Sequence, residues 1–301
     1  MTAAQAPAPN VVVILGASSG IGRATAHALA ARGDRLGLAS RSAEVLDQVR
    51  QECIARGAGE VLVVPTDVGD AASVDALFKT AVEALGRVDG VVTTAGVLAY
   101  GRFEDVPSEV FDRTMITNVI GVANVARAAL RTFKGQEAGS LVVLGSVLGK
   151  ITAPWMSSYA ASKWAVHGLV RTLQIEARSM PDVNVTLVSP GGVNTPIYNS
   201  AGSYTGRSGH PPPPVDPPEK VAAAIIEALD RPRREISLGW ANPVMVFGFR
   251  ALPAVFDALV TPLMRLAGQS RRRVDPHPGN VLEADSEKLA VHGDWPRRFF
   301  N

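Results

Sequence analysis

The strongest constraint on the fold is a glycine-rich turn between a short apolar run and a helical pattern. Val11–Leu15 reads VVVIL and is followed by GASSGIG, residues 16–22. Residues 21–32 then repeat apolar side chains with a helical period, and this pattern ends at Gly33. A buried strand, a glycine turn and a helix in this order indicate a doubly wound α/β fold.

The chain up to residue 238 alternates in the same way. This alternation predicts a parallel sheet covered on both faces, a Rossmann-like doubly wound domain. Residues 191–216 are instead expected to form a long polar loop, which is typical of a lid or of disorder. The further strands are expected at 35–39, 60–64, 88–93, 141–144, 183–188 and 236–238, and the further helices at 42–56, 73–85, 111–133, 159–180 and 218–229.

Length and composition favour one large domain with an appendage, because 301 residues with 47% hydrophobic side chains suffice for a sizeable core. We expect a flexible tail at 1–9, a core domain at 10–238 and a C-terminal extension at 239–301. The tail lacks the basic and apolar regions of a signal peptide. The single cysteine, Cys53, fits a reducing compartment such as the cytoplasm. A net charge of +2 argues against a nucleic-acid partner.

The glycine turn favours nucleotide binding over a plain strand-to-helix connection, because backbone can approach a pyrophosphate at the helix N-terminus. The end of the second strand decides between cofactors. It carries Ser40 and Arg41 and no acidic residue. An arginine there receives a 2′-phosphate, so the sequence predicts NADP(H) rather than NAD(H), with Ser18 adding a hydroxyl. The alternative is that Arg41 is an ordinary solvated arginine.

Tyr159 and Lys163 lie four residues apart in a helical pattern, so their side chains share one face. A tyrosine has a pKa of about 10 and is a poor base near neutrality. A cation within about 4–6 Å lowers that pKa. Ser146 follows a predicted strand and is placed to bind a substrate oxygen. These three residues predict a proton-transfer site, and the alternative is a surface pair beside a capping serine.

Seven motifs occur in a fixed order along the chain: GASSGIG, Asp67 in TDV, the AG of TTAG at 93–96, Asn118 in TNVIG, Ser146, YAASK at 159–163 and PGGVNT at 190–195. Together they resemble the short-chain dehydrogenase/reductase family, in its short-core subgroup, over roughly residues 10–238. The chain departs from the family at Leu15, where threonine is usual, and at Thr93 and Thr94, which replace two asparagines.

The resemblance implies an NADP(H)-dependent oxidoreductase that interconverts a carbonyl and an alcohol. Tyr159 is then the acid/base, Ser146 orients the substrate, Lys163 lowers the tyrosine pKa and holds the ribose, and Asn118 holds a relay water. Tyr159 and Lys163 also belong to the expected cofactor site, with Gly16, Ser18, Ser19, Gly20, Ile21, Gly22, Ser40, Arg41, Asp67, Val68, Ala95, Gly96, Pro190, Gly191, Val193 and Thr195.

The family also implies a homo-oligomer, and we expect a dimer through the helices at 111–133 and 159–180. A rival hypothesis is a nucleotide-binding scaffold or sensor without turnover. Retention of Ser146, Tyr159, Lys163 and Asn118 speaks against that rival. His167 is expected to be structural. The other histidines show no metal-ligand spacing, so no metal site is expected.

Large apolar residues are expected around the substrate, which predicts a lipophilic ketone, aldehyde or secondary alcohol. The alternative is that they pack under the lid. Besides Ser146 and Tyr159, the expected substrate contacts are Val147, Leu148, Trp155, Met156, Ile197 and Tyr198.

The extension at 239–301 is apolar but is interrupted by Pro243, Pro253 and Pro262, and three arginines follow at 271–273. Three hypotheses compete for it. Short helices cover the substrate mouth or an oligomer interface, or an interfacial helix pair touches a membrane through 240–273. The third, a disordered tail, is disfavoured by the apolar content.

Overall fold

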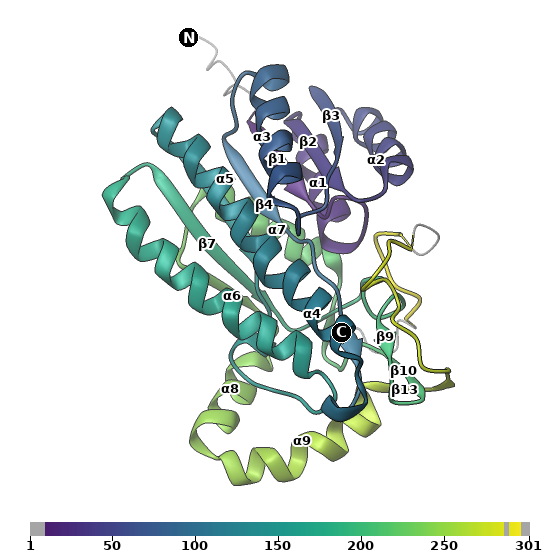
Figure 1. Ribbon diagram of the computed structural model, residues 1–301. Helices are drawn as coiled ribbons and strands as arrows, with labels where there is room; N and C mark the ends of the chain where they lie inside the picture. The colour runs from purple at the N-terminus through teal and green to yellow at the C-terminus, as the bar shows by residue number, and fades with distance from the viewer. Residues whose placement is uncertain (1–9, 286–288, 296–301) are drawn as a thin grey trace.

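A seven-stranded parallel sheet separates two layers of helices (Figure 1). The computed structural model describes residues 10–285 and 289–295, so the expected tail at 1–9 lies outside the described residues. The sheet consists of β1 Val11–Leu15, β2 Arg35–Ser40, β3 Glu60–Pro65, β4 Gly90–Thr93, β6 Gly139–Leu144, β7 Val183–Pro190 and β12 Glu235–Leu238. Its order is β12-β7-β6-β4-β1-β2-β3, with every pairing parallel. This confirms the predicted Rossmann-like doubly wound sheet.

Three helices cover each face of the sheet. One layer holds α1 Gly20–Ala31, α2 Ala43–Ala55 and α7 Pro218–Asp230. The other holds α3 Ala71–Leu85, α5 Gly121–Gln136 and α6 Ser157–Glu176. Alternate residues of β1 enter the two cores, Val13 with the α3 side and Ile14 with the α1 side. Cover on both faces explains why β1 is apolar at every position, because successive side chains point to opposite faces.

The middle of the chain differs from the sequence prediction at one helix. The helix expected at 111–133 consists of α4 Ser108–Met115, a π-helical turn at Ile116–Ile120, and α5. A π turn inserts one extra residue into a helix without changing its composition, so the apolar pattern does not reveal it. Such turns occur frequently at functional sites, and this one carries Asn118.

The region at 191–216 is more structured than the expected polar loop. It contains four short strands, and Ser200, Ala201 and Ser203 in it are buried. Its strands are β8 Gly192–Val193 paired with β11 Val215–Asp216, β9 Gly202–Ser203 paired with β5 Ala99–Tyr100, and β10 Arg207–Gly209 paired with β13 Gln269–Arg273. Single 3₁₀ turns occur at Phe103–Asp105, Val147–Gly149 and Ala177–Ser179.

The C-terminal extension begins with two helices, α8 Asn242–Ala251 and α9 Pro253–Ala267, which form an arch at one end of the molecule (Figure 1). Prolines stand in the first turn of both helices, where a missing N–H costs no hydrogen bond. The chain then returns through β13 and buries Val281 completely. The extension is therefore joined to the core at β13 and at Val281. Within the described chain, no helix combines the length and the apolar character needed to cross a bilayer.

Candidate active site

The glycine turn between β1 and α1 brings backbone atoms unusually close together. Gly16 has a φ of +87°, in the left-handed region that favours glycine. A Cβ on Gly22 would lie 2.1 Å from the carbonyl oxygen of Gly16, so no side chain fits there. The turn leaves a cleft at the carboxyl ends of β1 and β4, where the strand order reverses. This is the position at which doubly wound folds bind dinucleotides.

Thirteen of the expected cofactor residues line this cleft. They are Gly16, Ser18, Ser19, Gly20, Ile21, Gly22, Ser40, Arg41, Asp67, Val68, Ala95, Gly96 and Thr195. Pro190, Gly191 and Val193 line a neighbouring apolar cavity instead, because β7 ends between the two spaces. Although burial raises the pKa of Asp67, hydrogen bonds from Arg113 and the Gly69 N–H hold it below its usual range.

Polar atoms in the cleft fit the adenosine part of a dinucleotide. The Ser40 Oγ and Thr117 Oγ1 atoms are buried in its wall, and neither has a hydrogen-bond partner among the described residues. Buried hydroxyls of this kind are normally bonded. Arg41 stands beside Ser40, with a cationic head suited to a 2′-phosphate. The residues present therefore fit the cofactor.

The C-terminal extension supplies a wall of this cleft that the sequence did not predict. Asn280, Ala284, Asp285 and Leu289 line the cleft together with the core residues. The Gly20 N–H donates to the Ala290 carbonyl over 2.8 Å. Arg23 Nη1 donates to the Leu289 carbonyl over 3.1 Å. The bonds are made by main-chain carbonyls, so side-chain chemistry gives no signal for them.

Ser146 and Tyr159 meet at the carboxyl edge of the sheet. Ser146 follows β6, and its Oγ accepts the Leu148 N–H over 3.1 Å, which fixes the side chain at a 3₁₀ turn. Tyr159 lies in the first turn of α6 and is hydrogen-bonded to Ser146. Burial raises the pKa of Tyr159 to about 12, although the bond to Ser146 lowers it. The phenol is therefore protonated at neutral pH.

Lys163 lies one helical turn beyond Tyr159, with Nζ 5.5 Å from the centre of the phenol ring. The Nζ atom donates to the Leu144 carbonyl over 2.9 Å. Burial lowers the pKa of Lys163 to about 8. The expected depression of the Tyr159 pKa by Lys163 is not seen, because desolvation dominates at both groups.

Asn118 is completely buried in the π-helical turn. Its amide bonds both main-chain groups of Val97, at 2.8 Å and 3.0 Å, and the Ser162 Oγ at 3.0 Å. Asn118 therefore ties the loop after β4 to α6, beside Lys163. Its role in holding a relay water stays a prediction.

His167 lies behind Ser146, as a structural role predicts. Its Nε2 accepts the Ser146 N–H over 3.5 Å, and Cβ atoms on Gly145 or Gly149 would clash with the ring. Burial lowers the pKa of His167 to about 4, so the imidazole is neutral at physiological pH.

An apolar cavity of about 470 Å³ adjoins the Ser146–Tyr159 pair. It meets the nucleotide cleft at Ile21, Leu144 and Ile197, which line both spaces. Of the expected substrate contacts, Val147, Leu148, Met156, Ile197 and Tyr198 line the cavity. Trp155 does not line it; this residue has a left-handed backbone, with φ of +64°, and packs against the cluster of Leu98 and Met264.

Comparison with known proteins gives a consistent result. Residues 10–204 match the sequence profile of the family described as short chain dehydrogenase. An uncharacterized oxidoreductase, YxnA of Bacillus subtilis, is 32% identical over 276 residues, covering 91% of this chain and 77% of the relative.

Two solved structures are similar in fold and sequence. A short chain dehydrogenase/reductase from Burkholderia phymatum in complex with NAD has a TM-score of 0.72 and 28% identity, with 89% of this chain and 98% of that chain covered. An alcohol dehydrogenase from the archaeon Thermococcus sibiricus, complexed with 5-hydroxy-NADP, has a TM-score of 0.67 and 34% identity. The match covers 76% of this chain and 95% of that chain. With the parallel sheet, the glycine turn and the Ser146–Tyr159–Lys163 arrangement, these matches show that the chain belongs to the short-chain dehydrogenase/reductase family and is an oxidoreductase.

Proposed function

We propose that this protein is an NADP(H)-dependent oxidoreductase that interconverts a carbonyl and an alcohol on a lipophilic substrate. The observation that carries the proposal is the position of the Ser146–Tyr159 pair. It lines an apolar cavity that meets the nucleotide cleft at Ile21, Leu144 and Ile197. A carbonyl group held at Ser146 and Tyr159 would therefore lie next to the nucleotide cleft, where a bound nicotinamide would supply hydride.

The proton chemistry follows from the protonation state of the chain's own residues. In reduction, a bound nicotinamide supplies the hydride that the carbonyl carbon accepts, and the oxygen needs one proton. Tyr159 donates this proton, and Ser146 donates a hydrogen bond that orients the same oxygen. The Lys163 Nζ atom, 5.5 Å from the ring centre, is the cation that faces the phenolate left after this transfer. Oxidation of the alcohol runs through the same groups in reverse.

Arg41 and Ser40 support NADP(H) as the preferred cofactor. A cation lies at the adenosine end of the cleft, beside a buried hydroxyl that has no partner among the described residues. Solved relatives are bound to NAD in one case and to 5-hydroxy-NADP in another, so the family accommodates both kinds of dinucleotide. The first test is a fluorescence titration with NADPH and NADH. NADPH should bind more tightly, and Arg41→Ala should remove that difference. Equal affinity in the wild type would contradict the cofactor proposal.

Tyr159→Phe tests the proton transfer. This variant keeps the ring and loses the hydroxyl, so NADPH affinity should persist while carbonyl turnover falls roughly 10²–10⁴-fold. Retained turnover would remove Tyr159 from the mechanism. The rival function is a nucleotide-binding scaffold without turnover. In that case the wild-type protein should bind NADPH but reduce none of a panel of hydrophobic carbonyls.

We also propose a homodimer formed through α5 and α6. Apolar side chains on this side are partly exposed: Ile120 by 49%, Trp164 by 40% and Ile175 by 55%. Light scattering after size-exclusion chromatography tests this proposal, since Ile120→Glu should yield a monomer.

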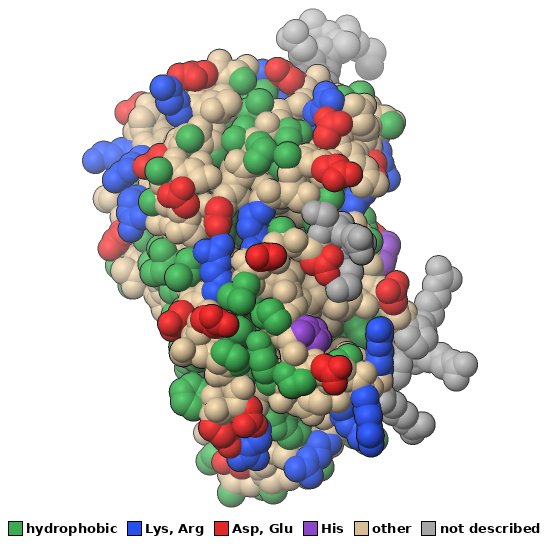
Figure 2. Space-filling model, turned by 45° about the vertical axis from the view of Figure 1, so that its right-hand side comes forward, with side chains coloured by type: hydrophobic (Ala, Val, Ile, Leu, Met, Phe, Trp, Pro, Cys, Tyr) green, Lys and Arg blue, Asp and Glu red, His purple; other side chains and the backbone are tan. Residues whose placement is uncertain are grey.

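Peripheral membrane contact through residues 240–273, from the cytoplasm, is a further proposal. Trp240, Phe247 and Leu266 are exposed there, and residues 239–273 carry five arginines against one aspartate. Figure 2 shows hydrophobic side chains together with Lys, Arg, Asp and Glu at this end of the molecule. Flotation with anionic vesicles tests the contact, and recovery of all the protein in the lipid-free fraction would refute it.

A further inference from the structure

The apolar cavity extends far beyond the reacting groups and is bounded by the arch of α8 and α9. Ser146 and Tyr159 line it together with side chains of α9 between Val255 and Ala267, with residues of α8, and with the segment at 212–214. The arch is fixed to the core. Phe249 packs on Trp164 of α6 and on Phe256, with ring centres 6.2 Å and 5.2 Å apart. The space is therefore a built trough and not a gap beside a loose helix.

A stripe of apolar side chains runs along the trough. Val255, Leu259 and Leu263 follow one another at four-residue spacing on α9, so they lie in a row on one face. All three line the cavity, yet their exposures are 53%, 53% and 57%. Apolar side chains that face into the molecule and remain half exposed indicate a surface that a ligand covers.

The opposite side of α9 has a different character, because Asp257, Thr261 and Arg265 do not line the trough. The helix thus turns its apolar face inward. Polar reactive groups occur at the sheet end of the trough, where Ser146 and Tyr159 lie. Such a site matches a ligand with one oxygen function at its head and an apolar remainder.

We propose that the trough holds a single elongated aliphatic chain whose carbonyl or hydroxyl group lies at Ser146 and Tyr159. The proposal rests on the proposed function and names its substrate class, a long-chain aldehyde, ketone or alcohol. The stripe favours a chain over a compact ring system, because it follows the helix axis. From Val255 to Leu263 it spans about 12 Å.

A homologous series of straight-chain ketones from four to twelve carbons tests the proposal. Each methylene buried in the trough should raise kcat/KM about fourfold until the stripe is filled. Leu259→Gln and Leu263→Gln place an amide in the stripe and should flatten this dependence on chain length. Leu266→Gln is the matched control, because Leu266 lies on the same helix, is 82% exposed and does not line the trough.

A second measurement is independent of turnover. A dansyl-labelled fatty acid should bind the Tyr159→Phe protein, and Leu259→Gln in that background should weaken binding at least about tenfold, whereas Leu266→Gln should not. If the probe binds in this pattern while the wild-type protein reduces no carbonyl, the trough is confirmed as a binding site for an aliphatic chain and the proposed function is wrong. Three outcomes would overturn the proposal. The first is a kcat/KM that does not change with chain length, and the second is a slope that both glutamine variants leave unaltered. The third is a higher kcat/KM for fused-ring ketones than for straight chains of equal carbon number.

Discussion

Arg41 Nη2 donates a hydrogen bond of 3.2 Å to the main-chain carbonyl of Asn280, a residue 239 positions later in the chain. The bond joins the residue expected to select NADP(H) to the C-terminal extension. Asn280 is itself fixed, since its N–H donates to the Ser200 carbonyl over 2.9 Å. The extension therefore positions Arg41 at the adenosine end of the cleft.

Gly279→Ala should weaken NADPH binding more than NADH binding. Gly279 has a φ of +58°, and a Cβ there would lie 2.3 Å from the Ser200 carbonyl oxygen. The substitution displaces Asn280 and releases Arg41, so the NADPH dissociation constant should rise roughly tenfold. Fluorescence titration measures it. Gly135→Ala is the control, because its Cβ would meet nothing within 4 Å. If the affinities for NADPH and NADH fall equally, the extension does not influence the choice between the two cofactors.

Asn118→Ala should destabilise the protein by about 2–3 kcal/mol and also reduce turnover, because two main-chain groups of Val97 lose their partners in a buried site. Urea unfolding and steady-state kinetics measure the two effects. Asn124→Ala is the matched control on α5. Its Nδ2 atom donates to the Val68 carbonyl and its Oδ1 accepts from Arg127, so stability should fall while turnover persists. Unchanged stability in Asn118→Ala would disprove a structural role.

His167→Gln should make the protein less sensitive to acid. Burial lowers the pKa of His167 from 6.5 to about 4, so between these values the unfolded chain binds a proton that the native state does not. Wild-type stability therefore falls as the pH falls through this window. Glutamine still offers an oxygen to the Ser146 N–H but does not titrate. Urea midpoints at pH 7.5 and pH 5 should differ less in the variant, and an identical difference would contradict the assignment.

Lys163→Met should stabilise the protein near neutral pH while abolishing turnover. Burial lowers the pKa of Lys163 from 10.5 to about 8, so the unfolded chain holds one proton more between these values. Wild-type stability should rise with pH across that window, and the methionine variant should lack this rise. Thermal unfolding at pH 7 and pH 9.5 measures the difference. A variant less stable than the wild type at pH 7 would show that the buried ammonium is stabilising.

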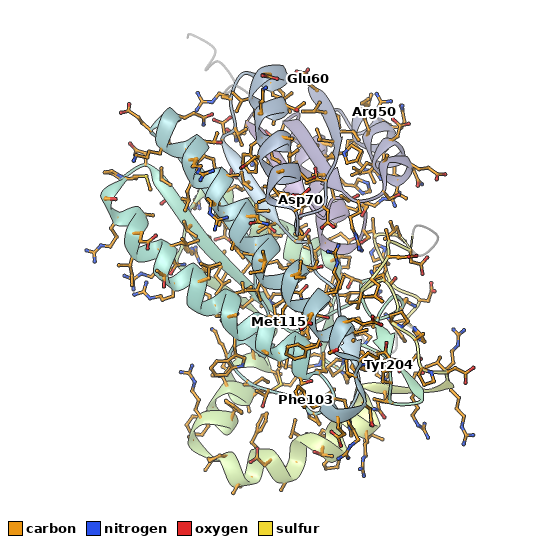
Figure 3. The ribbon with its side chains drawn as sticks, viewed as in Figure 1. Arg50, Glu60, Asp70, Phe103, Met115 and Tyr204 are labelled. Atoms are coloured by element: carbon orange, nitrogen blue, oxygen red, sulfur yellow. The ribbon has the colours of Figure 1, made fainter. Side chains whose placement is uncertain are left out.

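A substitution on α2, far from the arch of α8 and α9, serves as a common control for these tests. Figure 3 shows Arg50 on α2 at one end and Phe103 at the other, where α8 and α9 lie. Ile54, also on α2, is 48% exposed and lines neither the cleft nor the cavity. Ile54→Glu should therefore leave cofactor affinity and the chain-length dependence unchanged, and a change in either would reveal a non-specific effect of surface charge.

The sequence by itself determined the sheet, the glycine turn and the Ser146–Tyr159–Lys163 arrangement. These features depend on local signals: apolar runs that end at Gly16, helical spacing between Tyr159 and Lys163, and parallel strands whose ends meet at one edge. The motifs of the resembling family added Asn118 and Asp67. Each signal occupies a few neighbouring residues, so it is readable without knowledge of the remaining chain.

Tertiary structure alone decided where the extension lies and in which direction the pKa values of the buried groups shift. The bonds from Arg41 to Asn280 and from Gly20 to Ala290 involve main-chain carbonyls, which every residue possesses. The raised pKa of Tyr159 and the lowered pKa of Lys163 come from desolvation, which depends on how the whole chain packs around them. Main-chain contacts between residues far apart in the sequence leave no pattern in the sequence. The same is true of the loss of water around buried groups.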